Sequence, residues 1–349
     1  MCFLKNTLTY TLMNALRENS PNPKVAGPSA DGLALAWKAK GLVRPECVLA
    51  TAGGSLYTAD WRGGVAHLLP DGTQQLYTGV LSNDEPPRPN GIALLPNGDF
   101  LFAHLGAQDG GVYRLTRQGV ITPWLLEVDG QPLPPTNFVV QDGEGRTWIT
   151  VSTRKQPRAL GYRADCDDGF IICVDADDCA RIAADGLGYA NEVAVHPDGQ
   201  WLYVNETFVR RLSRYPLAAD GSLGGRETVA QFGPGTFPDG LAFDEEGAAW
   251  VVSIVSNRLI RVAPDGSQQV WLEDSDAGHL AWVEAAYRAD AMDRPHLDAN
   301  PGKRLRNISS IAFAGSDRRT AVLGCLLGDR LTCLRLPVPG HPPIHWNYA

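Results

Sequence analysis

The feature that most constrains this chain is a polar residue that begins the same short segment six times along its 349 residues. In each copy the polar residue precedes a short apolar run. After most of these runs comes a turn such as Pro96-Asn97-Gly98, and then a second apolar run. Such self-similarity is typical of solenoids and propellers, in which each unit is one supersecondary element. The six polar residues are Glu46, Asn90, Asn137, Asn191, Asp239 and Ser309.

The spacing of the copies indicates the architecture. From Glu46 to Asp239 successive copies begin 44 to 54 residues apart, and the last interval, to Ser309, is 70. Four short strands with their turns need roughly 40–50 residues, the length of one propeller blade. The apolar runs show no helical period and turn signals are frequent. The sequence therefore predicts an all-β fold, a six-bladed β-propeller.

The domain prediction follows from the repeat. A single propeller domain is expected over residues 29–349, preceded by an N-terminal extension over residues 1–28. Residues 33–38 are expected to close the last blade together with the C-terminal segment 340–346. The long last interval predicts a lid-like insertion between blades 5 and 6 at residues 273–307, with a short helix whose Trp282 and Tyr287 serve for packing.

The repeat also predicts a site. The first strands of propeller blades surround a central channel, so the six polar residues should form a ring at one mouth of that channel. Hard oxygen donors on one axis suit calcium, and Glu46 with Asp239 would balance a divalent charge. Calcium is favoured over zinc, magnesium or manganese. The alternative is that Asn-Gly and Asp-Gly are ordinary turn residues.

Loops after the second strands should line the same mouth as the ring. His104 is the most suggestive of their residues, because histidine titrates near neutral pH and serves as an acid or base. Arg62 and Arg154 are candidates to orient a substrate carboxylate or hydroxyl. The alternatives are a structural histidine and solvated rim arginines. Residues 155–168 are expected to form a loop at this mouth.

Composition excludes several classes of function. A formal net charge of -8 without a basic run argues against nucleic acid. No apolar run approaches a membrane span, and the N-terminal residues lack the core of a signal peptide. The seven cysteines include no Cys-x-x-Cys and suit a reducing compartment. We expect a cytoplasmic monomer or weak homo-oligomer with a small-molecule substrate.

Four segments carry a family resemblance: residues 44–49, beginning Arg-Pro-Glu; residues 137–148, beginning Asn-Phe-Val-Val; residues 191–195; and residues 237–251, beginning Phe-Pro-Asp-Gly. In order and register, they resemble the senescence marker protein / gluconolactonase / luciferin-regenerating enzyme family. The resemblance implies a six-bladed propeller with one divalent metal in the channel. Carried over by position, the metal ligands are Glu46, Asn137, Asn191 and Asp239.

The resemblance also implies a reaction. Asn90 matches the Asn-Gly of gluconolactonase-like members and would face the substrate or a metal-bound water. The chain departs from the family pattern at Cys47, where Gly-Pro is common, and at Thr136, near which sugar-lactonase members often carry an arginine. The implied function is a hydrolase that opens a small lactone, sugar lactone-like or another cyclic ester. The metal would polarise the carbonyl while Asp239 assists water attack.

Three other functions remain open at this point. A phosphotriesterase-like hydrolase could use the same metal and carboxylate. A lyase or condensing enzyme like the strictosidine-synthase propellers would typically lack the metal ring. A non-enzymatic propeller would bind calcium or a protein partner, because a fold alone does not imply a function.

Overall fold

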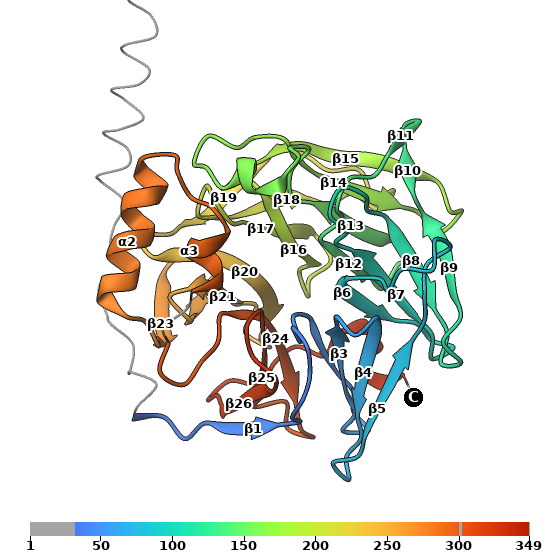
Figure 1. The fold of residues 1–349 in the computed structure, drawn as a ribbon, viewed down its shortest axis with the longest axis horizontal. Helices are drawn as coiled ribbons and strands as arrows, with labels where there is room; N and C mark the ends of the chain where they lie inside the picture. Colours follow the sequence, from blue (N-terminus) through green and yellow to red (C-terminus); the bar gives the residue numbers. More distant parts are fainter. Residues whose placement is uncertain (1–31, 300–301, 349) are drawn as a thin grey trace, which may run out of the picture.

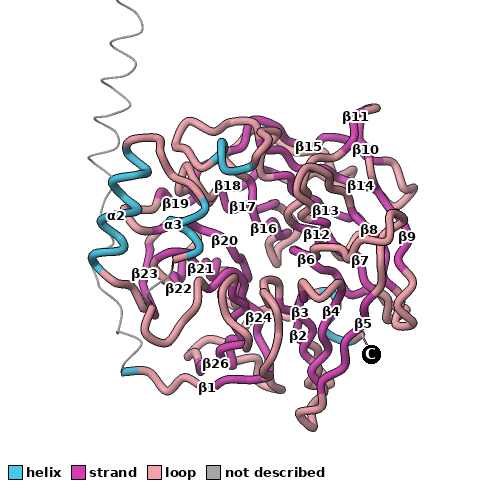
Figure 2. The backbone as a smooth tube through the Cα atoms, in the orientation of Figure 1, coloured by secondary structure: helices cyan, strands magenta, loops and turns pink. Residues whose placement is uncertain are grey.

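A computed structural model describes residues 32–299 and 302–348 of the chain. The predicted N-terminal extension, residues 1–28, lies outside the described residues, as does the expected domain start at residue 29. Within them the chain forms six four-stranded antiparallel sheets, which are arranged as blades around one axis (Figure 1). Helix is confined to a few short segments (Figure 2). The six-bladed β-propeller predicted from the sequence is confirmed.

The strands follow one another from the axis outwards in the first five blades. Blades 1 and 2 comprise β2 Val48–Ala50, β3 Leu56–Asp60, β4 Gly64–Leu68 and β5 Gln74–Thr78, then β6 Pro89–Leu94, β7 Phe100–His104, β8 Val112–Leu115 and β9 Ile121–Leu125. A small hairpin, β10 Glu127–Val128 and β11 Gln131–Pro132, leads to blade 3: β12 Phe138–Gln141, β13 Thr147–Val151, β14 Gly169–Val174 and β15 Ala180–Leu187.

The remaining blades have the same order. Blades 4 and 5 comprise β16 Ala190–Val195, β17 Trp201–Glu206, β18 Arg211–Pro216 and β19 Glu227–Gln231, then β20 Thr236–Phe243, β21 Ala249–Val255, β22 Arg258–Val262 and β23 Gln268–Leu272. Blade 6 contains β24 Ile308–Ala314, β25 Thr320–Cys325, β26 Leu331–Arg335 and, outermost, β1 Ala36–Lys38. Each first strand contacts the first strands of both neighbouring blades, so these six strands surround the channel.

The two ends of the chain close the propeller in different ways. Strand β1 pairs antiparallel with β26, Trp37 opposite Thr332, and so completes blade 6 as predicted (Figure 1). The prediction that residues 340–346 join the same blade was wrong. This segment bridges to Asp244 of blade 5, and the short helix η3, Ile344–Asn347, follows at the far end of the channel. Its prolines lack the N–H groups that a strand needs.

Bulges in the first strands aim the ring residues into the channel. In β6, Asn90 and Gly91 together oppose the single residue Ala103, because Pro89 pairs with His104 and Ile92 with Phe102. Register shifts occur at the same place in β16, β20 and β24, at Asn191, Asp239 and Ser309. A bulge of this kind bends the strand locally and re-aims a side chain.

The glycines after Asn90 and Asp239 are explained by close approach between blades. A Cβ on Gly240 would lie 2.6 Å from both the Ser309 carbonyl oxygen and the Ser310 Cα, and one on Gly91 would lie 2.6 Å from the Phe138 Cα. Both glycines lie inside first strands rather than in turns. The alternative interpretation of Asn-Gly and Asp-Gly as ordinary turn residues is therefore wrong.

The turns at the far face repeat one polar motif. The indole of the fully buried Trp148 donates to the Asp142 carboxylate at 2.8 Å, and Trp250 donates to Asp244 at 2.9 Å. Each aspartate also accepts backbone N–H groups of its own turn. The motif satisfies buried polar groups at the face opposite the ring.

None of the helices in the described part of the chain is long and apolar enough to cross a membrane.

Replacing Gly240 with alanine should destabilise the propeller. The added methyl group meets backbone atoms of blade 6, which cannot move aside as a side chain would. We expect Gly240→Ala to cost about 1–3 kcal/mol of the free energy of unfolding, the range for overpacked sites. Gly143→Ala is the matched control, because its Cβ would meet nothing within 4 Å. Equal chemical denaturation midpoints for the two variants would contradict the interpretation.

Candidate active site

The predicted ring residues lie in one hydrogen-bonded chain at the channel mouth. The Asn90 amide donates to Glu46 Oε1 at 2.7 Å and to Asn137 Oδ1 at 2.6 Å. The Asn137 amide donates to Asn191 Oδ1 at 2.8 Å, and the Asn191 amide to the Thr207 hydroxyl at 3.1 Å. The structure thus brings together three of the four predicted ligands, together with the predicted substrate residue Asn90.

Asp239 occupies the remaining part of the ring. The Thr207 hydroxyl donates to the carbonyl of Pro238, one residue before it, at 2.8 Å. The Asp239 side chain is only 3% exposed, yet no donor in the described part of the chain hydrogen-bonds to its carboxylate. A buried carboxylate without donors is costly unless a cation or a proton compensates its charge. Asp239 is therefore the ring residue whose negative charge most requires compensation by a cation or a proton.

Asp239 lies among other buried carboxyl groups. Burial, and then the nearby charges of Glu46 and Glu192, raise the pKa of Asp239 well above its usual value. Burial also raises the pKa of Glu192 to about 8, and the charge of Glu46 adds to the effect. Glu192 accepts the backbone N–H of Leu241 at 2.8 Å. In the metal-free protein the neutral form of Glu192 is thus favoured near pH 7, and the pKa of Asp239 is shifted in the same direction.

Sequence reasoning missed Glu192, although a signal for it exists. Two of the ring residues, Asn90 and Asp239, are followed by glycine, whereas Asn191 is followed by glutamate. Since the bulges place both residues of each pair at the channel, a charged residue at this position enters the channel. Glu192 lines a cavity of about 450 Å³ that continues from the ring to the C-terminal segment, together with Cys47, Phe138 and Ser310.

Two arginines lie close enough to act on this group of carboxyls. An Arg44 guanidinium nitrogen lies 2.7 Å from Glu46 Oε2 and 3.4 Å from the side-chain oxygen Oδ1 of Asn90. Arg158, from the short helix η2 Arg158–Gly161, donates to the Ser152 hydroxyl at 3.1 Å. The charges of both arginines lower the pKa of Asp239, against the larger effect of burial. Arg44 stands in the segment Arg44-Pro45-Glu46, whereas nothing in the sequence marked Arg158.

The ring residues fit a hard divalent cation. Glu46 Oε2 has no hydrogen bond of good geometry, and Asp239 has no donors in the described part, so both carboxylates keep lone pairs for another partner. Asn137 and Asn191 add amide oxygens beside them. Oxygen-only donors of this kind suit calcium better than a softer metal. Glu46, Asn137, Asn191 and Asp239 are the residues that would hold it.

His104 is buried and held by its own loops. Its Nδ1 accepts the backbone N–H of Arg88 at 3.1 Å, which leaves the proton of the neutral ring on Nε2. Nε2 lies 3.8 Å from Asp109, and the ring packs edge-on against Tyr113. Burial lowers the pKa of His104, so the ring is neutral near pH 7. These contacts position the residues before Asn90, and a substrate role for His104 stays a prediction.

Neither predicted mouth arginine is brought to the ring. Arg62 forms a two-pronged ion pair with Asp60, with distances of 2.8 Å. Arg154 pairs with Asp185 of the outermost strand of blade 3 and lies over the Phe170 ring, 4.1 Å from its centroid. Their roles in substrate binding stay predictions, while Arg44 and Arg158 occupy the places next to the carboxyl groups.

Helices of the predicted insertion pack on the ring side of blades 4 and 5. Helix α2, Ala277–Arg288, and helix α3, Arg294–Asp298, lie between β23 and β24. The buried side chain of Glu284 ion-pairs with Arg210 at 2.6 Å and accepts the Gly235 N–H at 2.7 Å. Tyr287 packs edge-on against Phe237 and its hydroxyl donates to the Phe208 carbonyl, which confirms its predicted packing role. Trp282, by contrast, is 45% exposed, and its ring centroid lies 4.2 Å from that of His296 in α3. That the insertion acts as a lid stays a prediction.

Breaking the Arg210–Glu284 pair should loosen this insertion. Glu284→Ala leaves the Arg210 charge buried without its carboxylate, and removal of one partner of such a pair costs about 3–5 kcal/mol. Arg288→Ala is the matched control, because Arg288 lies 3.7 Å from the same carboxylate but is 70% exposed. Its cost should stay below about 1 kcal/mol. Denaturant unfolding of both variants measures the difference, and equal costs would argue against α2 being anchored through this pair.

Proton retention by Glu192 should lower the stability of the metal-free protein as pH rises from ~6.5 to ~8. The folded chain keeps a proton on Glu192, whose pKa is about 8, and the pKa of Asp239 is also raised, whereas the carboxyl groups of the unfolded chain have already released their protons. Buried histidines such as His67 and His345, with pKa values of about 4, act in the opposite direction, because the unfolded chain still holds some of their protons near ~6.5, and this effect fades above ~7.5. Over the same window calcium affinity should rise, because the cation competes with the protons on the carboxyl groups.

Thermal unfolding with and without a chelator, and calcium titration calorimetry, test this pH dependence. Glu192→Gln is the matched variant, since it keeps the shape of the side chain but cannot ionise. It should flatten the slope of melting temperature against pH. Equal slopes for the metal-free wild-type protein and Glu192→Gln would show that Glu192 is not held protonated.

Known proteins resemble this chain in sequence. The family model described as SMP-30/Gluconolactonase/LRE-like region matches residues 44–273. A 6-deoxy-6-sulfogluconolactonase from Pseudomonas putida is 32% identical over 218 residues, which are 60% of this chain and 68% of that protein.

Solved structures share the fold at lower identity. A gluconolactonase from Xanthomonas campestris is 20% identical with a TM-score of 0.64, over 87% of this chain and 89% of that one. The calcium-binding protein regucalcin from Agrobacterium tumefaciens is 19% identical with a TM-score of 0.66, over 93% and 100%. Because the family model covers well over half of the residues, the chain belongs to the SMP-30/gluconolactonase/LRE-like family.

Proposed function

We propose that this protein is a metal-dependent lactonase, which opens a small sugar-like lactone or another cyclic ester by hydrolysis. The observation that carries the proposal is Asp239: a buried carboxylate at the channel mouth, without donors in the described part of the chain and beside the oxygen donors of the ring. This is the arrangement expected of a group that both holds a cation and accepts a proton.

Asp239 is suited to accept the proton of the attacking water. Its pKa is raised by burial and by neighbouring carboxyl groups, and a carboxylate with a raised pKa is a stronger base. The positive charges of Arg44 and Arg158 act in the opposite direction and favour the ionised form that a base requires. When bound, a divalent cation supplies an electrophile that draws electron density from the ester carbonyl.

Other residues of the mouth orient the substrate. The Asn90 amide binds Glu46 and Asn137 in the present arrangement, so it lies where a substrate oxygen would meet the ring. Arg44 stacks its guanidinium over Trp61, 4.4 Å from the ring centroid, which fixes one wall of the mouth. The buried ring and its walls limit the water that reaches the reacting ester.

The known relatives support this chemistry. The Pseudomonas putida relative and the Xanthomonas campestris structure are both named as lactonases. The Agrobacterium tumefaciens structure is named as a calcium-binding protein, which supports calcium ahead of zinc, magnesium or manganese for the ring.

Asp239→Asn should lower kcat for lactone hydrolysis about 10²–10⁴-fold, the contribution of a positioned acid–base group. The change keeps an oxygen donor but removes the base. Bound metal is therefore measured on the same samples, so that a lost base is separated from a lost cation. The matched control is Asp198→Asn on a far-face turn, which should retain kcat within about 2-fold.

Two results would overturn the proposal. An Asp239→Asn enzyme that keeps both its metal and near-wild-type turnover would remove the role of Asp239. Stoichiometric metal without hydrolysis of any lactone in a panel would favour the non-enzymatic calcium-binding alternative, and release of acid from phosphotriesters alone would favour the phosphotriesterase alternative.

A further inference from the structure

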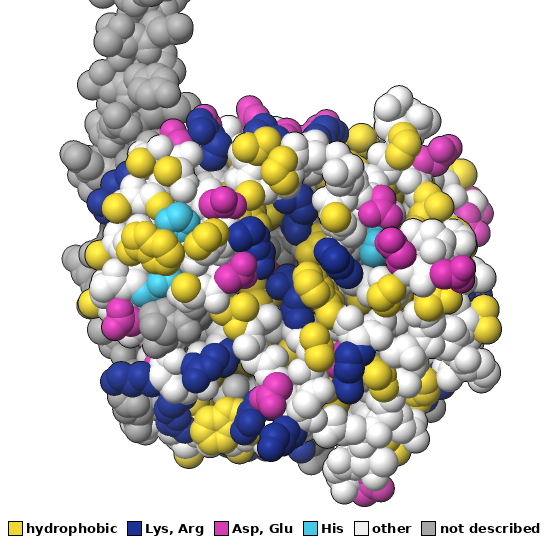
Figure 3. All heavy atoms as spheres, in the orientation of Figure 1, with side chains coloured by type: hydrophobic (Ala, Val, Ile, Leu, Met, Phe, Trp, Pro, Cys, Tyr) yellow, Lys and Arg dark blue, Asp and Glu magenta, His cyan; other side chains and the backbone are white. Residues whose placement is uncertain are grey.

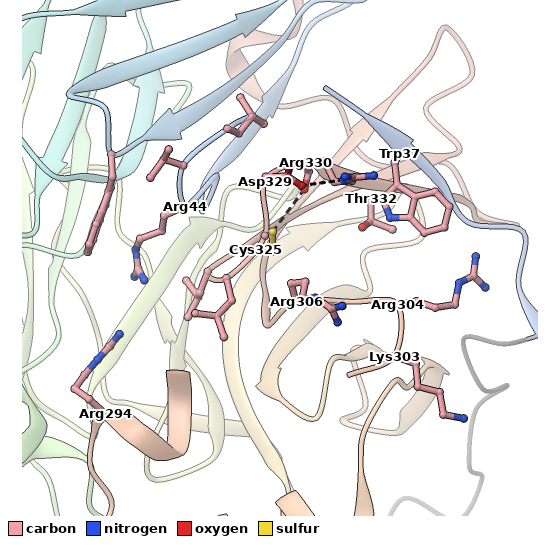
Figure 4. A pocket seen from close by; sticks show the side chains of 16 residues that line it. Trp37, Arg44, Arg294, Lys303, Arg304, Arg306, Cys325, Asp329, Arg330 and Thr332 are labelled. Carbon is pink, nitrogen blue, oxygen red and sulfur yellow. Dashed lines mark hydrogen bonds and ion pairs between the residues drawn. The ribbon is translucent and has the colours of Figure 1, made fainter. Parts of the chain in front are cut away.

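A large cavity opens beside the ring, over blade 6. Its volume is about 890 Å³. Its walls come from β1, the segment before β2, the β3–β4 loop, helix α3, the end of the insertion and the β25–β26 loop (Figure 4). It lies on the face shown in Figure 3, where Lys and Arg side chains gather around a hollow at the middle. Arg44 lines the cavity and also contacts Glu46 of the ring, so the cavity adjoins the proposed active site.

The charge of this cavity contrasts with that of the whole chain. The chain has a net charge of -8, but the charged residues that line the cavity are six cations and one carboxylate, Asp329. Such a concentration of one sign in a concave surface attracts ligands of the opposite sign. The six cations are Arg44, Arg294, Lys303, Arg304, Arg306 and Arg330.

Nearby carboxylates offset only part of this charge. Arg330 pairs with Asp329 at 2.9 Å, Arg44 with Glu46 at 2.7 Å, and Arg294 with Asp298 one helical turn away. The Arg306 guanidinium donates to the backbone carbonyls of Gly302 and Leu305, and no carboxylate in the described part of the chain pairs with it. Arg306 thus brings to the cavity a positive charge that no described carboxylate neutralises.

The cations reach from the ring to the outer part of the cavity. Arg44 touches two ring residues, Glu46 and Asn90, and also lines the cavity. The charges of Arg44 and Arg306 both lower the pKa of the Cys325 thiol, against the larger effect of burial, so both arginines lie near that residue of the cavity wall. From helix α3, Arg294 points its guanidinium toward the same space as Arg44 (Figure 4). Like charges converging on one space favour an anion between them.

We infer that this cavity binds an anionic group of the substrate, so that the lactone opened at the ring carries a sulfonate, phosphate or carboxylate away from its ester. The inference rests on the proposed lactonase function. Guanidinium groups bind such oxyanions through paired N–H donors, and arginine rather than lysine supplies five of the six cations. Arg44 holds the end of the cavity nearest the ring, and Arg294 and Arg306 bind the anionic group.

Matched substrates and variants test the inference by kinetics. The substrates are glucono-1,5-lactone and its derivatives that carry phosphate, sulfonate or carboxylate at carbon 6. The wild-type enzyme should prefer an anionic lactone by at least about 10-fold in kcat/KM, and added salt should reduce the preference. Arg294→Gln and Arg306→Gln should each lower kcat/KM for the anionic lactone about 10-fold, the effect of losing a charged hydrogen bond, and change that for the neutral lactone less than about 3-fold.

Arg335→Gln is the control for charge alone. This substitution removes the same charge from an exposed arginine, which pairs with Asp317. Arg335 is the last residue of β26, at the end of the strand that is distant from the cavity. The substitution should leave both substrates unaffected. The comparison of the three anionic lactones identifies which oxyanion the cavity accepts.

A binding measurement separates this inference from the proposed function. Glucose 6-phosphate and glucose contain no lactone, so calorimetry with them reports the cavity whether or not the protein hydrolyses lactones. Binding of glucose 6-phosphate that is tighter than that of glucose and is weakened by Arg306→Gln supports the inference even if no lactone is opened. Equal rates on neutral and charged lactones, or binding that is unaffected by Arg294→Gln and Arg306→Gln, would overturn it while the lactonase function stands.

Discussion

The structure depends on the burial of negative charge at the mouth of one channel. Six first strands converge on the propeller axis, and three carboxyl groups, Glu46, Glu192 and Asp239, lie there away from water. Two nearby arginines, Arg44 and Arg158, compensate only part of that charge. A protein can keep such carboxyl groups buried either by protonating them or by binding a cation beside them. The pH and the metal concentration decide which of the two states is populated. Stability and the proposed chemistry are thereby linked at the same atoms.

The same convergence sets the backbone around the site. Neighbouring first strands approach each other so closely at Gly91 and Gly240 that a Cβ has no room there. Bulges turn the preceding residues, Asn90 and Asp239, into the channel. The residue after a ring residue is thus either a glycine without a side chain, as in these two blades, or a residue whose side chain enters the channel, as Glu192 does. The residue after the ring residue therefore differs between blades, and a glutamate in blade 4 adds a carboxyl group to the channel.

The insertion between blades 5 and 6 adds helices and arginine side chains to one side of this mouth. Helix α2 is held on blades 4 and 5 by the buried Arg210–Glu284 pair, and the chain beyond it carries Arg294 and Arg306 to the cavity over blade 6. In the proposed function the ring supplies the reaction, whereas the insertion adds Arg294 and Arg306 to a cavity that blade segments also line. Reaction and substrate preference would then be divided between the propeller and its insertion.

The sequence by itself determined the propeller and most of the ring, because a residue at a fixed place in every repeat must lie at a fixed place around the axis. It placed Glu46, Asn90, Asn137 and Asn191 together, and it predicted that β1 closes blade 6. Only the tertiary structure decided which arginines meet the ring. Arg62 and Arg154 are engaged by Asp60 and Asp185, whereas Arg158 arrives from a loop without a repeat signal. The path of the C-terminal segment and the basic cavity also depend on contacts between distant segments, which no local pattern records.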